Sequence, residues 1–368
     1  MDIEQARQEI AAADEAMAAA FVRRMEAVEA VAAYKKERGL PILDRAQEER
    51  VIRRNSAWVA DPEKRSFYIR FLQDVMDVSK QYQHRLVNGA RIAYSGVEGA
   101  FAHIAAERIF PDGELVSYAS FEDAYHAVAE GGCDCAVLPI ENSYAGEVGQ
   151  VMDLMFSGDL HVNGVYELQI TQNLLGTPDA SLEDVRTVVS HPQALSQCQR
   201  YLHRHGFTEQ SASNTARAAQ FVAEQGDRHV AAIASAETAA LYGLKILDHD
   251  INESKANTTR FAVFSRAENC PGGAREDGTF LLLFTVNHVA GALAQAINVI
   301  GEYGFNMKAL RSRPMKALPW QYYFYVEAEG SGGNADRMLE ALARHCTMLK
   351  LAGRFSASEE ILKEGDAL

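Results

Sequence analysis

One short segment gathers side chains that could do chemistry. The segment NTTRFAVF, residues 257–264, joins an amide, two hydroxyls and a guanidinium to an apolar run. The run has the composition of a strand, so helix capping does not explain the polar residues before it. Arg260 offers a two-pronged partner for a carboxylate, and the hydroxyl of Thr259 can donate to a leaving group. The segment predicts a site for an anionic substrate.

Other polar phrases also stand at the ends of expected strands. They are PIENSYAG (139–146), SHPQALSQC (190–198) and SNTARAA (213–219). Ligands of open α/β sheets bind at such ends, and two lobes of this kind would enclose a cleft. Helix capping by Ser190 or His191, and by Asn214 or Thr215, is the alternative for each phrase taken alone.

A second set of polar residues lies on a helical stripe near the N-terminus. Arg24 and Lys35 project close to a stripe of apolar residues and stand about 16 Å apart along one helix. Cations on a core-facing stripe need a partner, although both could also extend to the rim of a bundle. The i, i+4 pairs Asp44 with Glu48, after Pro41 at the start of a new helix, and Ser79 with Gln83 favour a polar pocket.

The first helix should run from residue 3 to about 36, roughly 50 Å. Its apolar stripe is Ile3, Ile10, Met17, Phe21 and Val28. A lone bundle of about 85 residues cannot cover so long a helix, so an intertwined dimer is expected. Arg7 points elsewhere on the helix and would then reach the partner's pocket.

Composition limits the classes of function. The 368 residues suggest two to four domains, and the net charge of −14 argues against nucleic acid and anionic membranes as partners. The run FLLLFTV (280–286) is too short to span a bilayer. Five cysteines without C-x-x-C, and a charged helical N-terminus instead of a signal peptide, predict a cytoplasmic protein without a metal site.

Composition and hydrophobic periodicity divide the chain into three regions. Residues 1–87 are expected to be all-helical, and residues 90–267 alternate short apolar runs with helical patterns, as two α/β lobes would. The segment 267–278, AENCPGGAREDG, has the composition of a linker. Residues 278–356 then follow the order βαββαβ of a ferredoxin-like domain.

The helical region resembles the all-helical chorismate mutases over residues 3 to about 85. In order and spacing, seven positions match the substrate-contacting set of that family: Arg7, Arg24, Lys35, Asp44, Glu48, Ser79 and Gln83. The resemblance implies that the arginines and the lysine hold the carboxylates and the ether oxygen of chorismate. It makes Arg24, Lys35 and Gln83 catalytic, with Lys35 stabilising a developing enolate-like oxygen. Gln47 stands where the family commonly has arginine.

The α/β region resembles the prephenate dehydratases over about 91–266, through GVEGAFAHIAA (96–106), PIENS, SHPQ…QC, SNTA and TRF. The family's fold is a two-lobed unit like the periplasmic binding proteins. The resemblance implies a catalytic role for Thr259, which helps the ring hydroxyl of prephenate to leave. It implies a prephenate site of five further residues: Asn142, Ser143, Gln193, Arg260 and Phe261. Ala100 replaces a small hydroxyl residue of the family.

The C-terminal region resembles the ACT regulatory domains. Gly291-Ala292-Leu293 falls at the first strand-to-helix turn, where backbone N–H groups can meet a carboxylate. Ser312-Arg313-Pro314 matches the end of the family's Glu-Ser-Arg-Pro phrase, with Arg311 in place of the glutamate. These six residues are the expected effector site, and phenylalanine is the implied effector. A plain dimerisation domain is the alternative.

Together the resemblances predict a bifunctional chorismate mutase–prephenate dehydratase of phenylalanine biosynthesis, a homodimer or homotetramer that uses no cofactor. A non-enzymatic amino-acid sensor is the alternative from another class, but it needs no pairing of a basic pocket with a positioned hydroxyl. A mutase–dehydrogenase would need a nicotinamide site, and no G-x-G-x-x-G follows a strand here.

Overall fold

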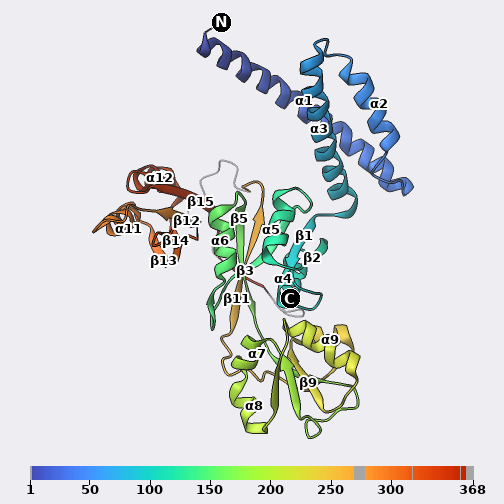
Figure 1. The fold of residues 1–368 in the computed structure, drawn as a ribbon, viewed down its shortest axis with the longest axis vertical. Helices are drawn as coiled ribbons and strands as arrows, with labels where there is room; N and C mark the ends of the chain where they lie inside the picture. Colours follow the sequence, from blue (N-terminus) through green and yellow to red (C-terminus); the bar gives the residue numbers. More distant parts are fainter. Residues whose placement is uncertain (1, 269–277, 317, 357, 362–368) are drawn as a thin grey trace. The chain divides into compact units, whose positions relative to one another are not determined.

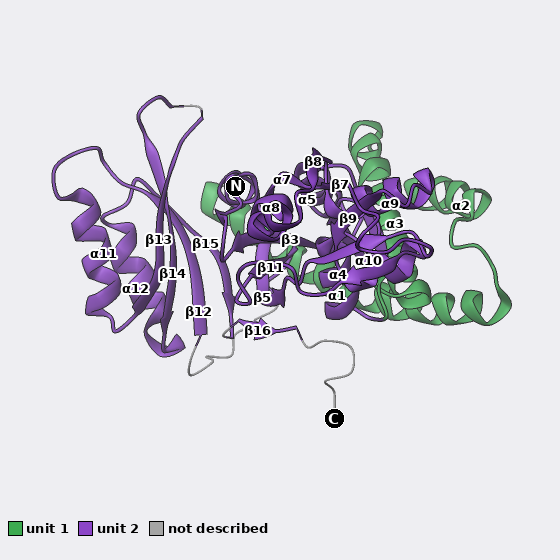
Figure 2. Cartoon of the chain, turned by 90° about the horizontal axis from the view of Figure 1, so that it is seen from below, with its two compact units in different colours: residues 1–91, 112–114 green, residues 92–111, 115–368 purple. Residues whose placement is uncertain are grey.

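The computed structural model describes residues 2–268, 278–316, 318–356 and 358–361 (Figure 1). These residues fall into two compact units, coloured separately in Figure 2. Unit 1 comprises residues 1–91 and 112–114, and unit 2 comprises residues 92–111 and 115–368. Most of the predicted linker 267–278 lies outside the described residues. No helix in the described ranges has the length and apolarity that a membrane crossing requires.

Unit 1 is built from three helices, as predicted for residues 1–87: α1 (Ile3–Arg38), α2 (Arg45–Ser56) and α3 (Pro62–Asn88). Helix α1 begins at a capping box, in which Asp2 accepts from the backbone of Gln5 and the Gln5 side chain accepts in return. It ends at Gly39, whose left-handed backbone (φ 62°) closes the last turn.

The start of the second helix differs from the prediction. Helix α2 begins at Arg45 and not directly after Pro41, because the Asp44 carboxylate accepts a hydrogen bond from the backbone N–H of Gln47 at 3.0 Å. Asp44 is therefore the N-cap of α2, so Asp44 and Glu48 are not two residues on one face of a helix.

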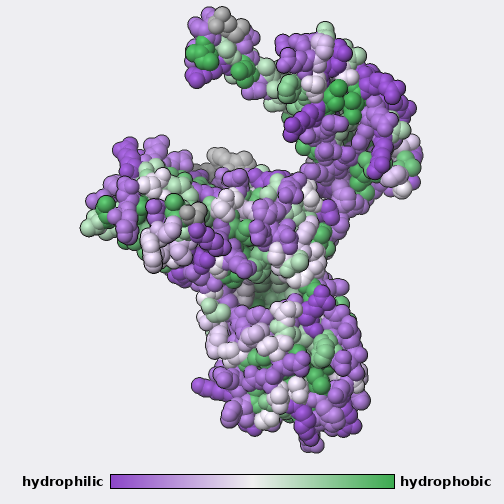
Figure 3. Space-filling model, in the orientation of Figure 1, coloured by the Kyte–Doolittle hydropathy of each residue, from purple (hydrophilic) through white to green (hydrophobic). Residues whose placement is uncertain are grey.

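The apolar stripe predicted on α1 is only partly covered within one chain. Val28 is buried. The other four members of the stripe, Ile3, Ile10, Met17 and Phe21, are exposed. Figure 3 shows green hydrophobic atoms at the surface of this helical unit, among the purple hydrophilic ones. Apolar side chains in a row on a helix are typical of a surface that packs against something else.

The first lobe of unit 2 surrounds one half of an eleven-stranded sheet. Its strands run in the order β5-β11-β3-β1-β2, and β4 pairs with β3. The bounds are β1 (Arg91–Ser95), β2 (Glu114–Tyr118), β3 (Cys135–Asn142), β4 (Gly146–Glu147), β5 (His161–Gln169), β11 (Thr258–Ser265), α4 (Phe101–Ile109), α5 (Phe121–Ala129) and α6 (Gly149–Ser157).

The second lobe is a separate five-stranded sheet in the order β10-β6-β9-β7-β8. Its elements are β6 (Asn173–Gly176), β7 (Thr187–Ser190), α7 (Pro192–Gln197), α8 (Gln199–His205), β8 (Thr208–Ser211), α9 (Thr215–Gln225), β9 (Val230–Ala234), α10 (Ala236–Tyr242) and β10 (Lys245–Asp248). The chain enters this lobe after β5 and returns to the first lobe at β11. The prediction of two α/β lobes is confirmed.

The C-terminal residues extend the sheet of the first lobe. Their elements follow the order β12 (Gly278–Thr285), α11 (Ala292–Glu302), β13 (Asn306–Pro314), β14 (Tyr322–Gly330), the 3₁₀ turn η1 (Gly332–Asn334), α12 (Ala335–Ala343), β15 (Met348–Phe355) and β16 (Glu359–Glu360). The four long strands pair in the order β13-β14-β12-β15. Figure 2 shows α11 and α12 on the same face of these strands.

Strand β12 explains why this sheet is covered on both faces. Phe280, Leu282 and Phe284 pack with α11 and α12. Leu281 and Leu283 belong to the core of the first lobe, together with Met155 and Phe264. Successive side chains of a strand point to opposite faces, so the uninterrupted apolar run FLLLF fills two cores at once.

Gly353 is the point at which β15 meets β5, opposite Val162. A Cβ at Gly353 would overlap the carbonyl oxygen and the side chain of Val162. We therefore expect Gly353→Ala to destabilise unit 2 by about 1–3 kcal/mol, the usual cost of overpacking, measured as a lower thermal unfolding midpoint.

The matched control is Gly301→Ala, at an exposed position in α11 with nothing within 4 Å of the added Cβ. It should not destabilise unit 2, and any gain should stay below about 1 kcal/mol, because alanine favours a helix over glycine but Gly301 lies in the last turn of α11. Equal effects of the two substitutions would contradict the close approach of β15 to β5.

Candidate functional site

A cavity of about 680 Å³ is lined by residues of both lobes of unit 2. The first lobe contributes Asn142, Thr259 and Phe261 to its wall, and the second contributes His191 and Gln193. Four residues predicted for one site, Asn142, Gln193, Thr259 and Phe261, thus lie around the same cavity. The size is that of a small-molecule site.

Thr259 and Asn142 form the polar centre of the cavity. They lie directly opposite each other on β11 and β3, and Asn142 Nδ2 donates to Thr259 Oγ1 at 2.9 Å. The orientation of the Asn142 amide is fixed because its Oδ1 accepts from the backbone N–H groups of Tyr144 and Ala145 at 3.0 and 2.9 Å. An amide NH₂ can only donate, so Thr259 Oγ1 accepts here and keeps its own proton for another partner.

The second lobe reaches the same centre through Gln193. Its Nε2 donates to Asn142 Oδ1 at 3.2 Å. The preceding His191 caps α7, since its Nδ1 accepts from the backbone N–H of Gln193 at 3.3 Å. In the neutral ring this places the proton on Nε2. Burial lowers the pKa of His191, so the ring is neutral at pH 7.

Two predicted members of this site lie elsewhere. Ser143 does not line the cavity: its Oγ donates to the carbonyl of Ala256 at 2.9 Å and accepts from the N–H of Thr258 at the same distance. Ser143 therefore holds the end of β3 to the segment that leads into β11.

Arg260 was expected to fork a substrate carboxylate, and its position contradicts this. It alternates with Thr259 and Phe261 along β11, so its side chain points away from the cavity. Both of its outer nitrogens donate to the carboxylate of Glu327, at 2.8 Å each. The carboxylate that Arg260 binds belongs to the chain itself.

Sequence reasoning missed Arg217, which lines the cavity from α9. Asn214 caps this helix by accepting from the Arg217 N–H at 2.7 Å, as the capping alternative predicted. The Arg217 side chain is exposed and donates to Gln220 at 3.1 Å. Among the described residues that line the cavity it is the one arginine or lysine, and none of them is aspartate or glutamate. Arg217 is the arginine of SNTARAA, one of the polar phrases that the sequence places at the end of an expected strand.

The helical unit brings some of its predicted residues together. The guanidinium of Arg24 on α1 contacts the Ser79 hydroxyl and the Val75 carbonyl on α3, and burial lowers the pKa of Arg24. Gln83, one turn further along α3, is buried, and its Oε1 has no hydrogen-bond partner among the described residues. These groups can bind a polar ligand.

The remaining members of that set have other partners in this chain. Lys35 Nζ donates to the Ile42 carbonyl at 2.6 Å, and Glu48 pairs with Lys80 at 3.1 Å. Arg7 is 71% exposed and lies 3.8 Å from Glu4. Arg7 is about 25 Å from Arg24 along α1 at 1.5 Å per residue, so one chain does not bring them together. Lys80 was not predicted.

The predicted effector residues occupy two elements. Gly291, with φ 82°, is the N-cap of α11, so Ala292 and Leu293 lie in its first turn. Ser312 and Pro314 lie on the exposed face of β13. Arg313 faces the first lobe instead, where its Nε lies 3.0 Å from Asp153 and its Nη1 lies 3.1 Å from Glu147. The prediction that Arg313 meets an effector is therefore at odds with its side-chain direction.

Two family models match the chain. The model described as prephenate dehydratase matches residues 92–269, and the model described as chorismate mutase type II matches residues 6–84. A bifunctional chorismate mutase/prephenate dehydratase of Neisseria gonorrhoeae is 35% identical over 269 residues, which are 72% of this chain and 74% of that protein.

Two further proteins are similar. Arogenate dehydratase/prephenate dehydratase 2 of Arabidopsis thaliana, a chloroplastic protein, is 34% identical over 77% of this chain and 78% of its own length. The crystal structure of a prephenate dehydratase from Arthrobacter aurescens in complex with L-Phe has the same fold, with a TM-score of 0.67 and 24% identity over 73% of this chain and 90% of that one.

The chain belongs to the prephenate dehydratase family. The matched range 92–269 holds both lobes and the cavity, and the chorismate mutase match covers most of the three helices of unit 1. This prephenate dehydratase is thus fused to a chorismate mutase, and its two activities are consecutive steps of phenylalanine biosynthesis. The prediction of an enzyme is confirmed over that of a non-enzymatic sensor.

Arg217 is the one arginine or lysine among the described residues that line the cavity, and prephenate carries two carboxylates. Removing the charge with Arg217→Gln should raise KM for prephenate about tenfold, since a hydrogen bond to a charged group contributes about 1.5 kcal/mol or more. Steady-state dehydration of prephenate measures this.

The control is Arg204→Gln, an exposed arginine of α8 in the same lobe that does not line the cavity. Its KM should equal that of the unaltered enzyme. An unchanged KM in Arg217→Gln would exclude Arg217 from substrate binding.

Proposed function

We propose that Thr259 is the group that assists the departure of the ring hydroxyl of prephenate. The observation that carries this is the hydrogen bond from Asn142 to Thr259 Oγ1, which leaves the threonine proton free to donate into the cavity. In the reaction the bond between the ring and its carboxylate breaks, and the electron pair completes the aromatic ring. The carbon–oxygen bond breaks in the same step, so carbon dioxide and hydroxide leave and phenylpyruvate remains. A hydrogen bond from Thr259 stabilises the charge that develops on the leaving oxygen.

The charges around the cavity favour prephenate over arogenate as the substrate. Arogenate carries an ammonium group where prephenate has a keto group, and a buried ammonium needs a carboxylate partner. The described lining of the cavity contains no aspartate or glutamate, while Arg217 supplies a cation for the side-chain carboxylate that remains in the product. Neutral His191 and Gln193 can donate hydrogen bonds, but neither carries a negative charge to pair with an ammonium.

Chorismate is proposed to bind in unit 1 between α1 and α3. Arg24, Ser79 and the unpartnered Oε1 of Gln83 support this site, and Lys35 and Glu48 complete it. Arg7 joins it only from a second chain. The exposed stripe on α1 supports an intertwined homodimer, or a homotetramer built from it, because pairing two such helices buries Ile3, Ile10 and Met17. Asp44 contributes by capping α2.

The two activities should separate in single variants. Thr259→Ala should lower the dehydration rate about 10²–10⁴-fold, the usual contribution of proton donation, while chorismate is still consumed and prephenate accumulates. Lys35→Ala should slow chorismate turnover about 10²–10³-fold and leave dehydration of added prephenate unchanged. A time course of chorismate, prephenate and phenylpyruvate measures both.

Each variant is the other's control for folding. Loss of both activities in either folded variant would sink the model of two independent sites. An unchanged dehydration rate in Thr259→Ala would remove Thr259 from the reaction.

Residues 278–356 are proposed to be an ACT regulatory domain that senses phenylalanine. The βαββαβ order and the strand order β13-β14-β12-β15 support a ferredoxin-like domain. Phenylalanine is the ligand named for the Arthrobacter prephenate dehydratase of the same fold. The effector carboxylate would meet the backbone N–H groups of Ala292 and Leu293 at the start of α11.

The other two domains are proposed to span residues 1–87 and 90–267. The enzyme is proposed to work in the cytoplasm.

Gly291 gives a sharp test of the effector site. Dehydration of prephenate should slow when phenylalanine is added, and Gly291→Ala should weaken that response at least fivefold, because a Cβ at φ 82° distorts the first turn of α11. Inhibition curves measure the response.

Gly304→Ala is the control at the other end of α11. Gly304 has φ 84°, and as at Gly291 nothing lies within 4 Å of an added Cβ. Both variants therefore carry the same strain, and Gly304→Ala should keep the response. Equal loss in both would argue against an effector site at Gly291.

A further inference from the structure

Two neighbouring pairs of residues on β3 and β11 point in opposite directions. Thr259 lies opposite Asn142 and both line the cavity. The next residue of β11, Arg260, lies opposite Glu141, the residue before Asn142. Because side chains alternate along a strand, Arg260 and Glu141 face the other side of the sheet. The two residues of the reaction centre are thus covalently joined to two charged residues behind it.

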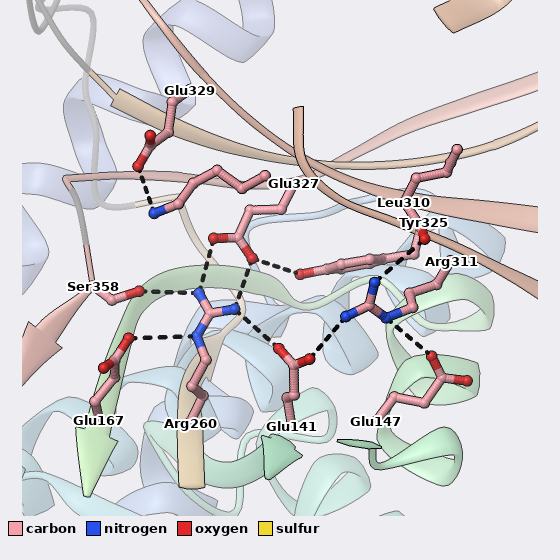
Figure 4. Close-up of polar contacts among 11 residues, drawn as sticks. Glu141, Glu147, Glu167, Arg260, Leu310, Arg311, Tyr325, Glu327, Glu329 and Ser358 are labelled. Atoms are coloured by element: carbon pink, nitrogen blue, oxygen red, sulfur yellow. Dashed lines mark hydrogen bonds and ion pairs between the residues drawn. The ribbon is translucent and has the colours of Figure 1, made fainter. Parts of the chain in front are cut away.

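Both charged residues are bound by the C-terminal strands, as Figure 4 shows. Arg260 donates to both oxygens of Glu327 on β14 at 2.8 Å, and to Ser358 at 3.0 Å. Glu141 lies 3.3 Å from Arg260 and accepts from Arg311 of β13 at 2.9 Å. Arg311 also lies 3.6 Å from Glu147.

The pair of Arg260 and Glu327 is the least exposed part of this network. The side chain of Glu327 is 2% exposed and that of Arg260 is 17% exposed. Burial lowers the pKa of Arg260, but the hydrogen bond and the charge of Glu327 raise it above its ordinary value. In the described residues Arg260 is the cation paired with Glu327, and the Tyr325 hydroxyl donates to the same carboxylate at 3.4 Å.

A buried two-pronged ion pair fixes position as well as charge. Two parallel hydrogen bonds to one carboxylate set both the distance and the angle of the guanidinium. A buried carboxylate cannot be left without its cation at low cost, so the pair resists separation. The backbone of β11 at Arg260 is therefore held against β14, and Thr259 is one residue away.

We propose that Glu327 is a positioning residue for the dehydratase, which holds Thr259 in register with the substrate through Arg260. Glu327 touches neither the cavity nor the substrate. It acts through the rigid guanidinium on the strand that carries the reacting hydroxyl. A misplacement of about 1 Å at a reacting group costs about 10²-fold in rate. This proposal rests on the role of Thr259 proposed above.

Glu327→Gln tests the proposal, because it removes the charge and keeps the shape. We expect kcat for prephenate dehydration to fall about 10- to 100-fold, with KM within about threefold of its original value. Chorismate turnover by the same chain should be unchanged. Glu327→Asp, which keeps a carboxylate, should recover part of the lost kcat.

The matched control is Glu329→Gln on the same strand, two residues along. Glu329 pairs with Lys308 at 2.7 Å, and their side chains are 36% and 41% exposed. This substitution removes a surface ion pair without touching β11, so kcat should stay within twofold.

The proposal is overturned if Glu327→Gln lowers the unfolding temperature but keeps kcat within twofold, since the pair would then only stabilise the fold.

Should Glu327→Gln not fold, Arg260→Lys carries the test, because lysine keeps the positive charge but cannot form two parallel hydrogen bonds to one carboxylate. Its kcat should fall at least fivefold with KM little changed, and a kcat within twofold overturns the proposal. A normal rate in Thr259→Ala would refute the role of Thr259 instead, which keeps the two failures distinct.

Discussion

The alternation of side chains along β11 is the constraint on which the rest of unit 2 depends. Thr259 and Phe261 face the cavity, while Arg260 between them faces the C-terminal strands. One strand therefore lines the cavity and takes part in an internal ion-pair network at the same time. The side chains on the two faces of β11 depend on the same register, because a shift by one residue would move each set of side chains to the opposite face.

The same principle organises the C-terminal residues. Strand β12 is apolar without interruption because it fills one core with Leu281 and Leu283 and another with Phe280 and Phe284. Strand β13 has Arg311 and Arg313 on the face toward the first lobe, where Glu141, Glu147 and Asp153 receive them. Burial raises the pKa of Asp153, but hydrogen bonds from Arg313, Tyr323 and Lys316 lower it below its ordinary value. Arg311, which stands where a glutamate was expected, thus meets the two glutamates of this cluster.

Within a single chain, unit 1 leaves an apolar surface of α1 exposed and Arg7 far from the rest of its predicted site. Helix α1 is capped at both ends and needs no partner to begin or end. Four members of its apolar stripe are nevertheless exposed, and Arg7 lies about five to eight turns from the other cations of the predicted site. The homodimer proposed above would account for both observations, since a second copy would cover the stripe and bring its own Arg7 to the site that already holds Arg24.

The sequence by itself determined the class of each region and several of the residues that line the cavity between the two lobes. Hydrophobic periodicity separated the three helices from the α/β lobes, and the phrases around Asn142, Gln193 and Thr259 pointed to one cleft. Periodicity and composition are local properties, and these residues lie next to the strand ends and helix starts that local sequence specifies.

The sequence did not determine which partner each charged side chain would bind. Arg260 and Arg313 bind carboxylates that lie 67 and 160 residues away, and Arg217 faces the cavity only because α9 packs where it does. A charged side chain takes its partner from whatever the fold brings within about 3 Å, so only the tertiary structure decided these roles.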